Sequence, residues 1–445
     1  MNIKQFKDDP LAHYSYAIVS DGKMALVDPA RNPMPYYRYA EEQKVKIVAV
    51  FETHPHADFI SSHLQIHQQT GAHIYVSEMV DAGYKHKSFD EGDSFKMGSI
   101  TFKAINTPGH SPDSITVVAE NDDKMALFTG DTLFIKDVGR PDLREDSGNK
   151  KAKRIDLAKK MYHSIQEKFK NFPDEALIYP AHGAGSLCGK NMSSDSSGTL
   201  GNERQGNWAF NEQTEEEFVE EILKDQPFIP NYFGYNVDIN NSGAENVQKT
   251  MAVANFHLMV TEVEKDILVI DTRDEKLFKN GHLPNSFNIM ARSEKDKFET
   301  WLGAIVKPKE AFYLVLESVE KFDEVLERVA KIGYENQLKG IVTLSAEVSE
   351  KNDKFNLKDF RKNKSSYTIV DIRNNSELED GKIFEEAFTV PLNELRDEAH
   401  QIPSHKPIVV HCAGGYRSAA GSSILANKFE HTKIYDLGED IKEFS

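Results

Sequence analysis

A short segment with two histidines and one aspartate constrains this chain most, because it joins a buried strand to a helix. The segment reads Phe51-Glu-Thr-His-Pro-His-Ala-Asp-Phe59. The apolar run 45–51 predicts a buried strand, and the pattern over 58–70 predicts a helix. His54 and His56 are two positions apart, so an extended backbone directs both side chains to one side. Imidazole and carboxylate groups suit transition metals, so the segment predicts a metal site. A surface turn that happens to hold two histidines is the alternative.

Three later segments each place one more polar residue at a turn or a strand end. They read Thr107-Pro-Gly-His110-Ser-Pro-Asp113, Leu127-Phe-Thr-Gly-Asp131-Thr-Leu-Phe134 and Tyr179-Pro-Ala-His182-Gly. Together with the first segment, in this order, they resemble the metallo-β-lactamase fold, and within it the persulfide dioxygenase branch. The segment Gly139-Arg-Pro-Asp-Leu143 resembles the substrate-side loop of that branch. The resemblance covers about the first half of the chain and implies an αββα sandwich.

One departure from the family pattern bears on the metal. The pattern His-x-His-x-Asp-His ends here in Phe59, which offers no lone pair. We therefore expect the second metal site of the dinuclear zinc hydrolases to be lost. The resemblance implies one Fe(II) per chain, held by His54, His110 and Asp131. Two histidines and one carboxylate form the facial triad of non-haem iron oxygenases.

Other residues of this half have supporting roles in the prediction. We expect three residues to orient the ligands or to remain from a lost second site: His56, Asp58 and His182. The resemblance implies that Arg140 helps to hold the thiol carrier of the substrate. Cys188 lies in the Gly-, Ser- and Asn-rich segment 183–207 and could be a thiol near the substrate. A small buried residue without a chemical role is the alternative for Cys188.

Length, charge and hydropathy narrow the class of protein. The 445 residues suggest two to four domains. The net charge of −17 argues against a nucleic-acid partner, whose phosphates would be repelled. The chain has no apolar run long enough to span a membrane, and its first residues lack the apolar core of a signal peptide. We therefore expect a cytoplasmic protein without a membrane partner, and we expect it to form a homo-oligomer.

The second half of the chain contains a repeat. The run 267–273 ends in Asp271-Thr-Arg273, and the run 367–373 ends in Asp371-Ile-Arg373, one hundred residues later. Each unit then carries another apolar strand followed by a helix, which indicates duplicated parallel α/β domains. Both units resemble rhodanese domains. We expect three domains, over residues 1–245, 246–347 and 352–445.

The second repeat carries a loop suited to sulfur transfer. It reads Val409-Val-His-Cys412-Ala-Gly-Gly-Tyr-Arg417-Ser418 and resembles an active rhodanese loop. A cysteine before a Gly-rich helix start faces backbone N–H groups that stabilise a thiolate, and Arg417 adds positive charge. We expect Cys412 to carry a persulfide, with Arg417 as its partner. The remaining loop residues are Ala413, Gly414, Gly415, Tyr416 and Ser418.

The first repeat departs from this pattern. Leu316 stands opposite Cys412, in the segment Val315-Leu-Glu-Ser-Val-Glu-Lys321. This segment has no cysteine or glycine, and glutamates replace the anion-binding loop. We expect this repeat to be inactive and to serve as a spacer or an interface.

The whole chain resembles the fusions of persulfide dioxygenase with sulfurtransferase that act in sulfide detoxification. The resemblance implies an enzyme that uses O2 and iron to oxidise a low-molecular-weight thiol persulfide to sulfite. Cys412 would move a sulfane sulfur, with sulfite and thiosulfate as reaction partners. A zinc-dependent thioester hydrolase of the glyoxalase II type with an accessory rhodanese is one alternative. A sulfur carrier or sensor without turnover is another.

Overall fold

The computed structural model describes residues 1–121, 124–145, 153–348 and 350–444, and the chain divides into two compact units. The first unit comprises Met1–Thr250 with Ala330–Gly333, and the second comprises Met251–Val329 with Tyr334–Ser445. No helix in the described part of the chain has the length and apolar character needed to cross a bilayer. The predicted cytoplasmic location, the homo-oligomer and the three finer domain ranges stay predictions.

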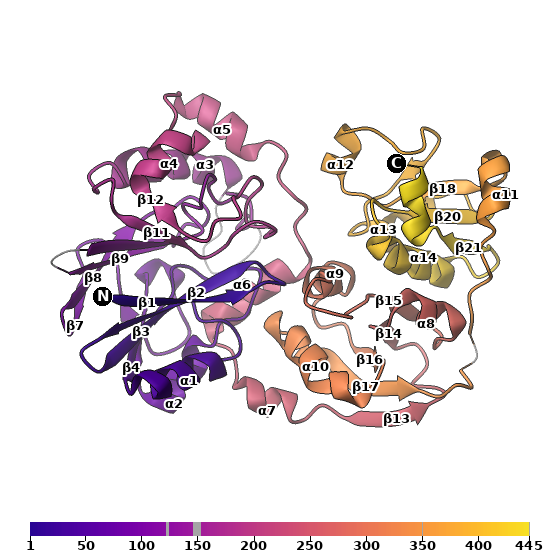
Figure 1. Ribbon diagram of the computed structural model, residues 1–445, viewed down its shortest axis with the longest axis horizontal. Helices are drawn as coiled ribbons and strands as arrows, with labels where there is room; N and C mark the ends of the chain where they lie inside the picture. Colours follow the sequence, from indigo (N-terminus) through magenta and orange to yellow (C-terminus); the bar gives the residue numbers. More distant parts are fainter. Residues whose placement is uncertain (122–123, 146–152, 349, 445) are drawn as a thin grey trace. The chain divides into compact units, whose positions relative to one another are not determined.

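Two six-stranded sheets form the centre of the first unit (Figure 1). In spatial order the first sheet contains β1 (Asn2–Asp8), β2 (His13–Ser20), β3 (Lys23–Val27), β4 (Lys46–Phe51), β5 (His73–Val76) and β6 (Lys87–Ser88). The second contains β12 (Gly198–Thr199), β11 (Leu177–Pro180), β10 (Lys124–Gly130), β9 (Ile115–Asn121), β8 (Ile100–Asn106) and β7 (Ser94–Met97). The hairpin of β2 and β3 is antiparallel, whereas β3, β4 and β5 pair in parallel.

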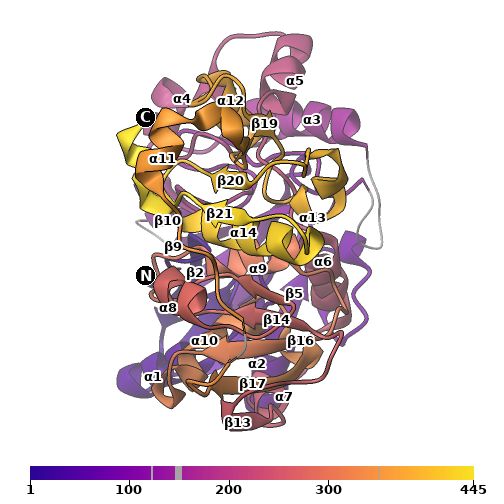
Figure 2. The same ribbon diagram turned by 90° about the vertical axis from the view of Figure 1, so that its right-hand side faces the viewer.

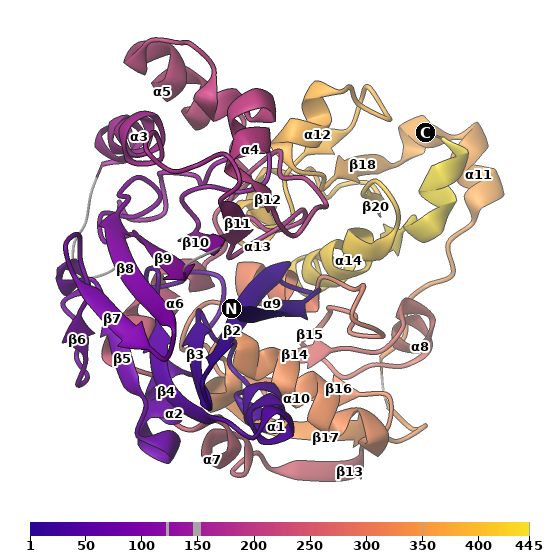
Figure 3. The same cartoon turned by 60° about the vertical axis from the view of Figure 1, so that its left-hand side comes forward.

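Three apolar layers explain why the sheets stack with helices outside. Between the sheets, Tyr16 and Phe51 pack among Phe102 and Phe128, and the rings of Phe51 and Phe102 are 5.0 Å apart. On the outer face of the first sheet lie α1 (Met34–Gln43) and α2 (His63–Thr70) (Figure 3). The outer face of the second sheet is covered by α3 (Arg154–His163), the π-helical turn η2 (Ser164–Lys168), α4 (Leu200–Gly206), η3 (Trp208–Phe210) and α5 (Glu215–Leu223). The predicted αββα sandwich is confirmed.

The helix predicted over 58–70 begins later, at His63, and residues 52–62 form a loop. The side chain of Asn240 accounts for this difference. Its Nδ2 donates to the carbonyl oxygens of His56 and Phe59, both at 2.8 Å, and its Oδ1 accepts from the Ser61 N–H at 2.9 Å. Buried backbone groups need partners, and Asn240 supplies them without a helix. Asn240 itself belongs to α6 (Tyr232–Ser242).

The second unit contains two parallel sheets, one from each repeat (Figure 2). The first has the order β13 (Phe256–Val260), β17 (Leu338–Leu344), β16 (Phe312–Leu316), β14 (Leu268–Asp271) and β15 (Ser286–Asn288). The second has the order β19 (Phe388–Thr389), β18 (Thr368–Asp371), β20 (Ile408–His411) and β21 (Ile434–Asp436). The α-helices from residue 247 onward in the described part of the chain are α7 (Val247–Met251), α8 (Glu275–Asn280), α9 (Phe298–Ile305), α10 (Phe322–Lys331), α11 (Leu357–Lys362), α12 (Asn375–Glu379), α13 (Leu395–Glu398) and α14 (Tyr416–Lys428).

The Asp-x-Arg pairs make the same contacts in both repeats. Arg273 donates to the Asp271 carboxylate and, at 2.7 Å, to the carbonyl oxygen of Gly281. Arg373 donates to the Asp371 carboxylate and, at 3.0 Å, to the carbonyl oxygen of Gly381. Each pair therefore ties the end of a central strand to the following glycine-containing loop. The predicted parallel α/β duplication is confirmed.

We predict that Asn240→Ala loosens the loop over 52–62. The change leaves two carbonyl groups and one N–H without their partner in a buried place, which costs about 3 kcal/mol locally. Hydrogen-exchange mass spectrometry should show roughly a hundredfold faster exchange in peptides that cover Phe59 and Ser61. The matched control is Asn202→Ala on the exposed side of α4, which should leave this loop unchanged. Equal protection in both variants would contradict the role of Asn240.

Candidate metal centre and sulfur-transfer loop

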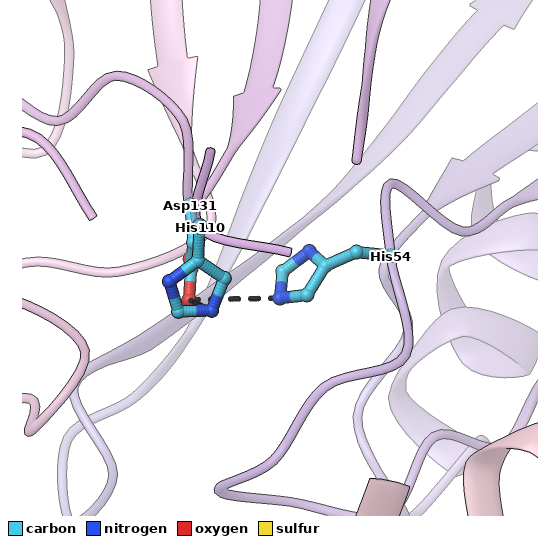
Figure 4. Close-up of side chains that lie close together, drawn as sticks. All are labelled: His54, His110 and Asp131. Atoms are coloured by element: carbon cyan, nitrogen blue, oxygen red, sulfur yellow. Dashed lines mark ion pairs between the residues drawn. The ribbon is translucent and has the colours of Figure 1, made fainter. Parts of the chain in front are cut away.

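The three predicted iron ligands lie together in the first unit. His54 follows β4, His110 lies between β8 and β9, and Asp131 follows β10. All three side chains are buried. Asp131 Oδ2 is 3.7 Å from His54 Nε2 and 3.5 Å from His110 Nε2, and the three groups point toward one another (Figure 4).

The chemistry of these donors fits a divalent metal. His110 Nδ1 donates to the carbonyl oxygen of Arg140 at 2.8 Å, so its Nε2 carries the lone pair. His54 Nδ1 is 3.1 Å from the Thr53 hydroxyl, while His54 Nε2 and Asp131 Oδ2 are buried without a hydrogen-bond partner. Burial lowers the pKa of both His54 and His110, which keeps both imidazoles neutral. Ligand atoms of all three residues lie within 4.8 Å of one another, as a shared ion requires.

Asp131 also has a partner on its other oxygen. His182 Nδ1 donates to Asp131 Oδ1 at 2.7 Å, and His182 Nε2 lies 2.8 Å from Asp58 Oδ2. Burial raises the pKa of Asp131, but the charge and hydrogen bond of His182 outweigh burial and hold this pKa well below its usual value. Asp131 is therefore ionised, with Oδ2 directed at the two imidazoles.

Close backbone packing places the ligands. A Cβ atom on Gly139 would collide with the carbonyl oxygen of Asp131 and would lie 3.0 Å from His110 Nδ1. Only glycine leaves room for the segment that carries Arg140 past both ligands. Close packing against Asp131 and His110 thus explains why a glycine stands at position 139.

Phe59 fills the position where the family pattern has a histidine. Its ring is buried, with its centroid 4.4 Å from that of His56 and 3.9 Å from that of His13. His56 Nε2 lies 3.2 Å from Asp28 Oδ1. The apolar ring occupies this space without offering a ligand, and the loss of the second metal site stays a prediction.

Three more groups in the described part of the chain have ligand spacing, and one of them shares Asp131 with the predicted iron ligands. They are His56 with Asp131 and His182, Asp58 with His182 and Cys188, and Asp28 with Glu52 and His56. Cys188 is thus placed beside two residues of the predicted centre, and its side chain is buried. Burial and the nearby Asp58 charge raise the pKa of the Cys188 thiol well above its usual value, so it is protonated.

Arg140 connects the metal centre to the segment of Cys188. Its Nε and Nη2 donate to Asp142 at 2.6 and 2.8 Å, and its Nη1 donates to the carbonyl oxygen of Leu187 at 3.2 Å. Its backbone N–H donates to the carbonyl oxygen of Cys188 at 2.9 Å. Arg140 is therefore engaged in holding two segments of the chain, and its contact with a thiol carrier stays a prediction.

The loop that is predicted to transfer sulfur lies in the second repeat. Cys412 follows β20 and is buried, and its Sγ accepts a hydrogen bond of 3.1 Å from the Gly415 N–H. Gly415 has a φ of 99°, and a Cβ on it would lie 2.7 Å from the Glu439 backbone nitrogen. Ser418 Oγ donates to the Gly415 carbonyl oxygen at 2.9 Å, whereas Ala413 and Gly414 are exposed. The loop therefore presents its sulfur to the Gly415 N–H at the start of α14.

Two residues of this loop have partners elsewhere in the second unit. Arg417 donates from both Nη atoms to the Glu377 carboxylate, at 2.5 and 2.7 Å. The Trp301 ring of the first repeat lies 6.0 Å from the Arg417 guanidinium. The Tyr416 hydroxyl donates to the Met290 carbonyl oxygen of the first repeat at 2.8 Å. The first repeat thus contributes contacts to the loop of the second.

The corresponding place in the first repeat is apolar. Leu316 ends β16 and is buried, and the 3-10 turn η4 (Val319–Lys321) follows. Leucine offers no nucleophile, so the inactivity of this repeat remains the expectation.

Several residues at both sites were not predicted from the sequence. Asp28, which accepts from the Thr53 N–H at 2.8 Å, could have been noticed as a carboxylate at the end of β3. Glu377 belongs to a capping box with Asn374 at the start of α12, and the spacing Asn-x-x-Glu is visible in the sequence. Nothing local marks Trp301 as a neighbour of Arg417.

Comparisons with known proteins assign both parts of the chain to known families. The metallo-beta-lactamase superfamily matches residues 8–182, and the rhodanese-like domain matches residues 258–339 and 356–445. Persulfide dioxygenase ETHE1, mitochondrial, of Homo sapiens is 33% identical over 159 residues, which are 35% of this chain and 58% of that protein. Hydroxyacylglutathione hydrolase of Rhizobium etli is 33% identical over 163 residues, which are 36% of this chain and 57% of that protein.

A solved structure matches over a longer range. The metallo-beta-lactamase from Staphylococcus aureus subsp. aureus COL is 30% identical with a TM-score of 0.66, and the match covers 77% of this chain and 99% of that one. The curated relatives, by contrast, are matched over little more than half of their length. The chain therefore belongs to the metallo-beta-lactamase superfamily through residues 8–182 and joins to that domain two rhodanese-like domains.

Proposed function

We propose that the first unit is a persulfide dioxygenase that oxidises a low-molecular-weight thiol persulfide with O2. The observation that carries the proposal is the convergence of His54, His110 and Asp131 on one point, with Phe59 in place of a further histidine. Two imidazoles and one carboxylate suit a mononuclear iron that keeps open positions for ligands. The persulfide dioxygenase relatives support the same reaction.

The overall reaction balances as RSSH + O2 + H2O → RSH + SO3²⁻ + 2 H⁺. Iron, when bound, would supply a centre that brings the outer sulfur and O2 together and passes electrons between them. The chain's residues hold and orient the ligands. The Arg140 carbonyl fixes His110 by accepting from Nδ1, and His182 leaves only Oδ2 of Asp131 for the metal.

In the second repeat, we place sulfur transfer on Cys412. Its thiolate attacks the outer sulfur of a donor persulfide, forming one S–S bond while the donor S–S bond breaks and the thiolate RS⁻ leaves with the electron pair. Sulfite then attacks the outer sulfur of the Cys412 persulfide, which releases thiosulfate and restores the thiolate. The hydrogen bond from Gly415 N–H to Sγ supports a negative charge at this sulfur.

A zinc-dependent thioester hydrolase is the second candidate. The hydroxyacylglutathione hydrolase of Rhizobium etli matches 36% of the chain at the same identity, 33%, as the human persulfide dioxygenase. The spacing of Asp58, His182 and Cys188 also offers a second set of ligands. Metal content separates the two candidates.

We predict that protein purified without oxygen binds one iron per chain. His54→Ala or Asp131→Ala should abolish this iron, because each removes one of three donors. The matched control is His163→Ala at an exposed position of α3, which should keep it. Metal analysis by mass spectrometry gives the count. Two tightly bound zinc ions per chain, together with thioester hydrolysis, would favour the hydrolase.

We predict that Cys412→Ser separates the two activities. Oxygen uptake should persist, because the metal ligands belong to another domain and the effects should be nearly independent. Sulfite should accumulate where the parent gives more thiosulfate, because the Cys412 persulfide that donates sulfur to sulfite is lost. Chromatography of sulfite and thiosulfate, corrected for the spontaneous reaction, measures the ratio. An unchanged ratio at equal turnover would count against coupling through Cys412.

A further inference from the structure

The ion pair between Arg417 and Glu377 has no part in the transfer chemistry described above. Glu377 lies in α12, and both of its oxygens accept from Arg417, at 2.5 and 2.7 Å. One oxygen also accepts from the Asn374 N–H at 3.0 Å, which fixes the carboxylate at the start of the helix. Such a two-point pair has a defined geometry and holds the guanidinium in one orientation.

Both members of the pair are charged. Burial raises the pKa of Glu377, but the hydrogen bonds and charge of Arg417 outweigh burial, so that this pKa lies below its usual value. The interaction between Arg417 and the Cys412 sulfur is among the causes that raise the pKa of Arg417. Arg417 thus stands between a thiol and a carboxylate, and its charge is largely matched by Glu377.

The other cations around the loop are matched in the same way. Arg373 is paired with Asp371 at 2.7 Å, and burial lowers the pKa of His411, which stays neutral. On the first repeat, beside Tyr416, Arg328 pairs with Glu299 at 2.7 Å. Arg417, Arg373 and Arg328 are thus each matched by one carboxylate, and the Gly415 N–H faces Sγ.

Charge distinguishes the possible sulfur donors. Attack of the Cys412 thiolate on thiosulfate gathers three negative charges at the loop, whereas attack on a thiol persulfide anion with an uncharged carrier gathers two. A carboxylate that cancels one positive charge therefore penalises the thiosulfate reaction more. One unit charge a few ångströms away, at the effective dielectric of a protein surface, changes a rate by about tenfold or more.

We infer that Glu377 is a specificity-determining residue, which makes Cys412 select thiol persulfides over thiosulfate as sulfur donors. The inference rests on the proposed transfer function of Cys412. Glu377 acts through Arg417 and has no assigned contact with the donor. Transfer of sulfur from the Cys412 persulfide to sulfite is the reverse of loading by thiosulfate and gathers the same negative charges. Glu377 therefore also slows this transfer to sulfite.

The test measures sulfur loading of Cys412 in the full chain by intact-mass spectrometry at increasing donor concentration. The two donors are thiosulfate and the persulfide of 2-mercaptoethanol, whose carrier has no charge. Glu377→Gln should lower the half-maximal thiosulfate concentration about tenfold and that for the persulfide only about threefold, because the persulfide anion carries half the charge of thiosulfate. The matched control is Glu379→Gln, which removes the same charge from an exposed position of the same helix and should resemble the parent.

A double variant separates charge from structure. Glu377→Gln with Arg417→Gln restores the net charge of the parent pair, so the donor selectivity should return toward that of the parent. Equal changes for both donors in Glu377→Gln, no change, or a double variant that keeps the selectivity of the single variant would overturn the inference. If Cys412 of the parent loads from neither donor, the proposed function itself fails. Loading with unaltered selectivity contradicts only the role of Glu377.

Discussion

The buried carboxylate of Asp131 is the group on which the first unit depends. A carboxylate in an apolar interior is costly unless hydrogen bonds and opposite charges compensate for lost water. His182 supplies that compensation on Oδ1, at 2.7 Å, and the imidazoles of His54 and His110 face Oδ2. The ends of strands from both sheets must therefore meet at this point. The αββα sandwich provides such a meeting point. Gly139 lets its own segment of the chain pass close to Asp131 and His110 there.

The two repeats of the second unit share one structural contact and differ in the residues that follow the next strand. Both repeats keep the Asp-x-Arg contact to a loop glycine, because that contact joins a central strand to its loop. Only the second repeat follows its next strand with Cys412 and a glycine-rich helix start. The first repeat supplies Met290 and Trp301 beside that loop, at the Tyr416 hydroxyl and the Arg417 guanidinium. Its retention in the chain is consistent with an interface role.

The sequence was sufficient for the features that depend on local pattern. Histidine and aspartate residues at strand ends, a glycine-rich turn after Cys412 and the repeated Asp-x-Arg runs are all visible without a structure, and the fold that they predict is confirmed. Features made by distant segments were missed. Asn240 replaces the first turn of a predicted helix from 184 positions away from His56. Cys188 and Asp58 lie close together although they are far apart in the sequence. Glu377 and Arg417 form their ion pair across 40 residues of sequence. No local pattern indicates either contact.

The most direct test of the proposed oxidation is oxygen consumption by the iron-loaded full chain with a thiol persulfide. An oxygen electrode should record uptake that depends on both iron and persulfide, with about one sulfite formed per O2 in the presence of a sulfite trap. Asp131→Asn keeps the shape of the side chain and removes its charge, so it should abolish uptake while the rhodanese repeats still load sulfur at Cys412. Hydrolysis of a thioester without any oxygen uptake by the iron-loaded protein would contradict the account.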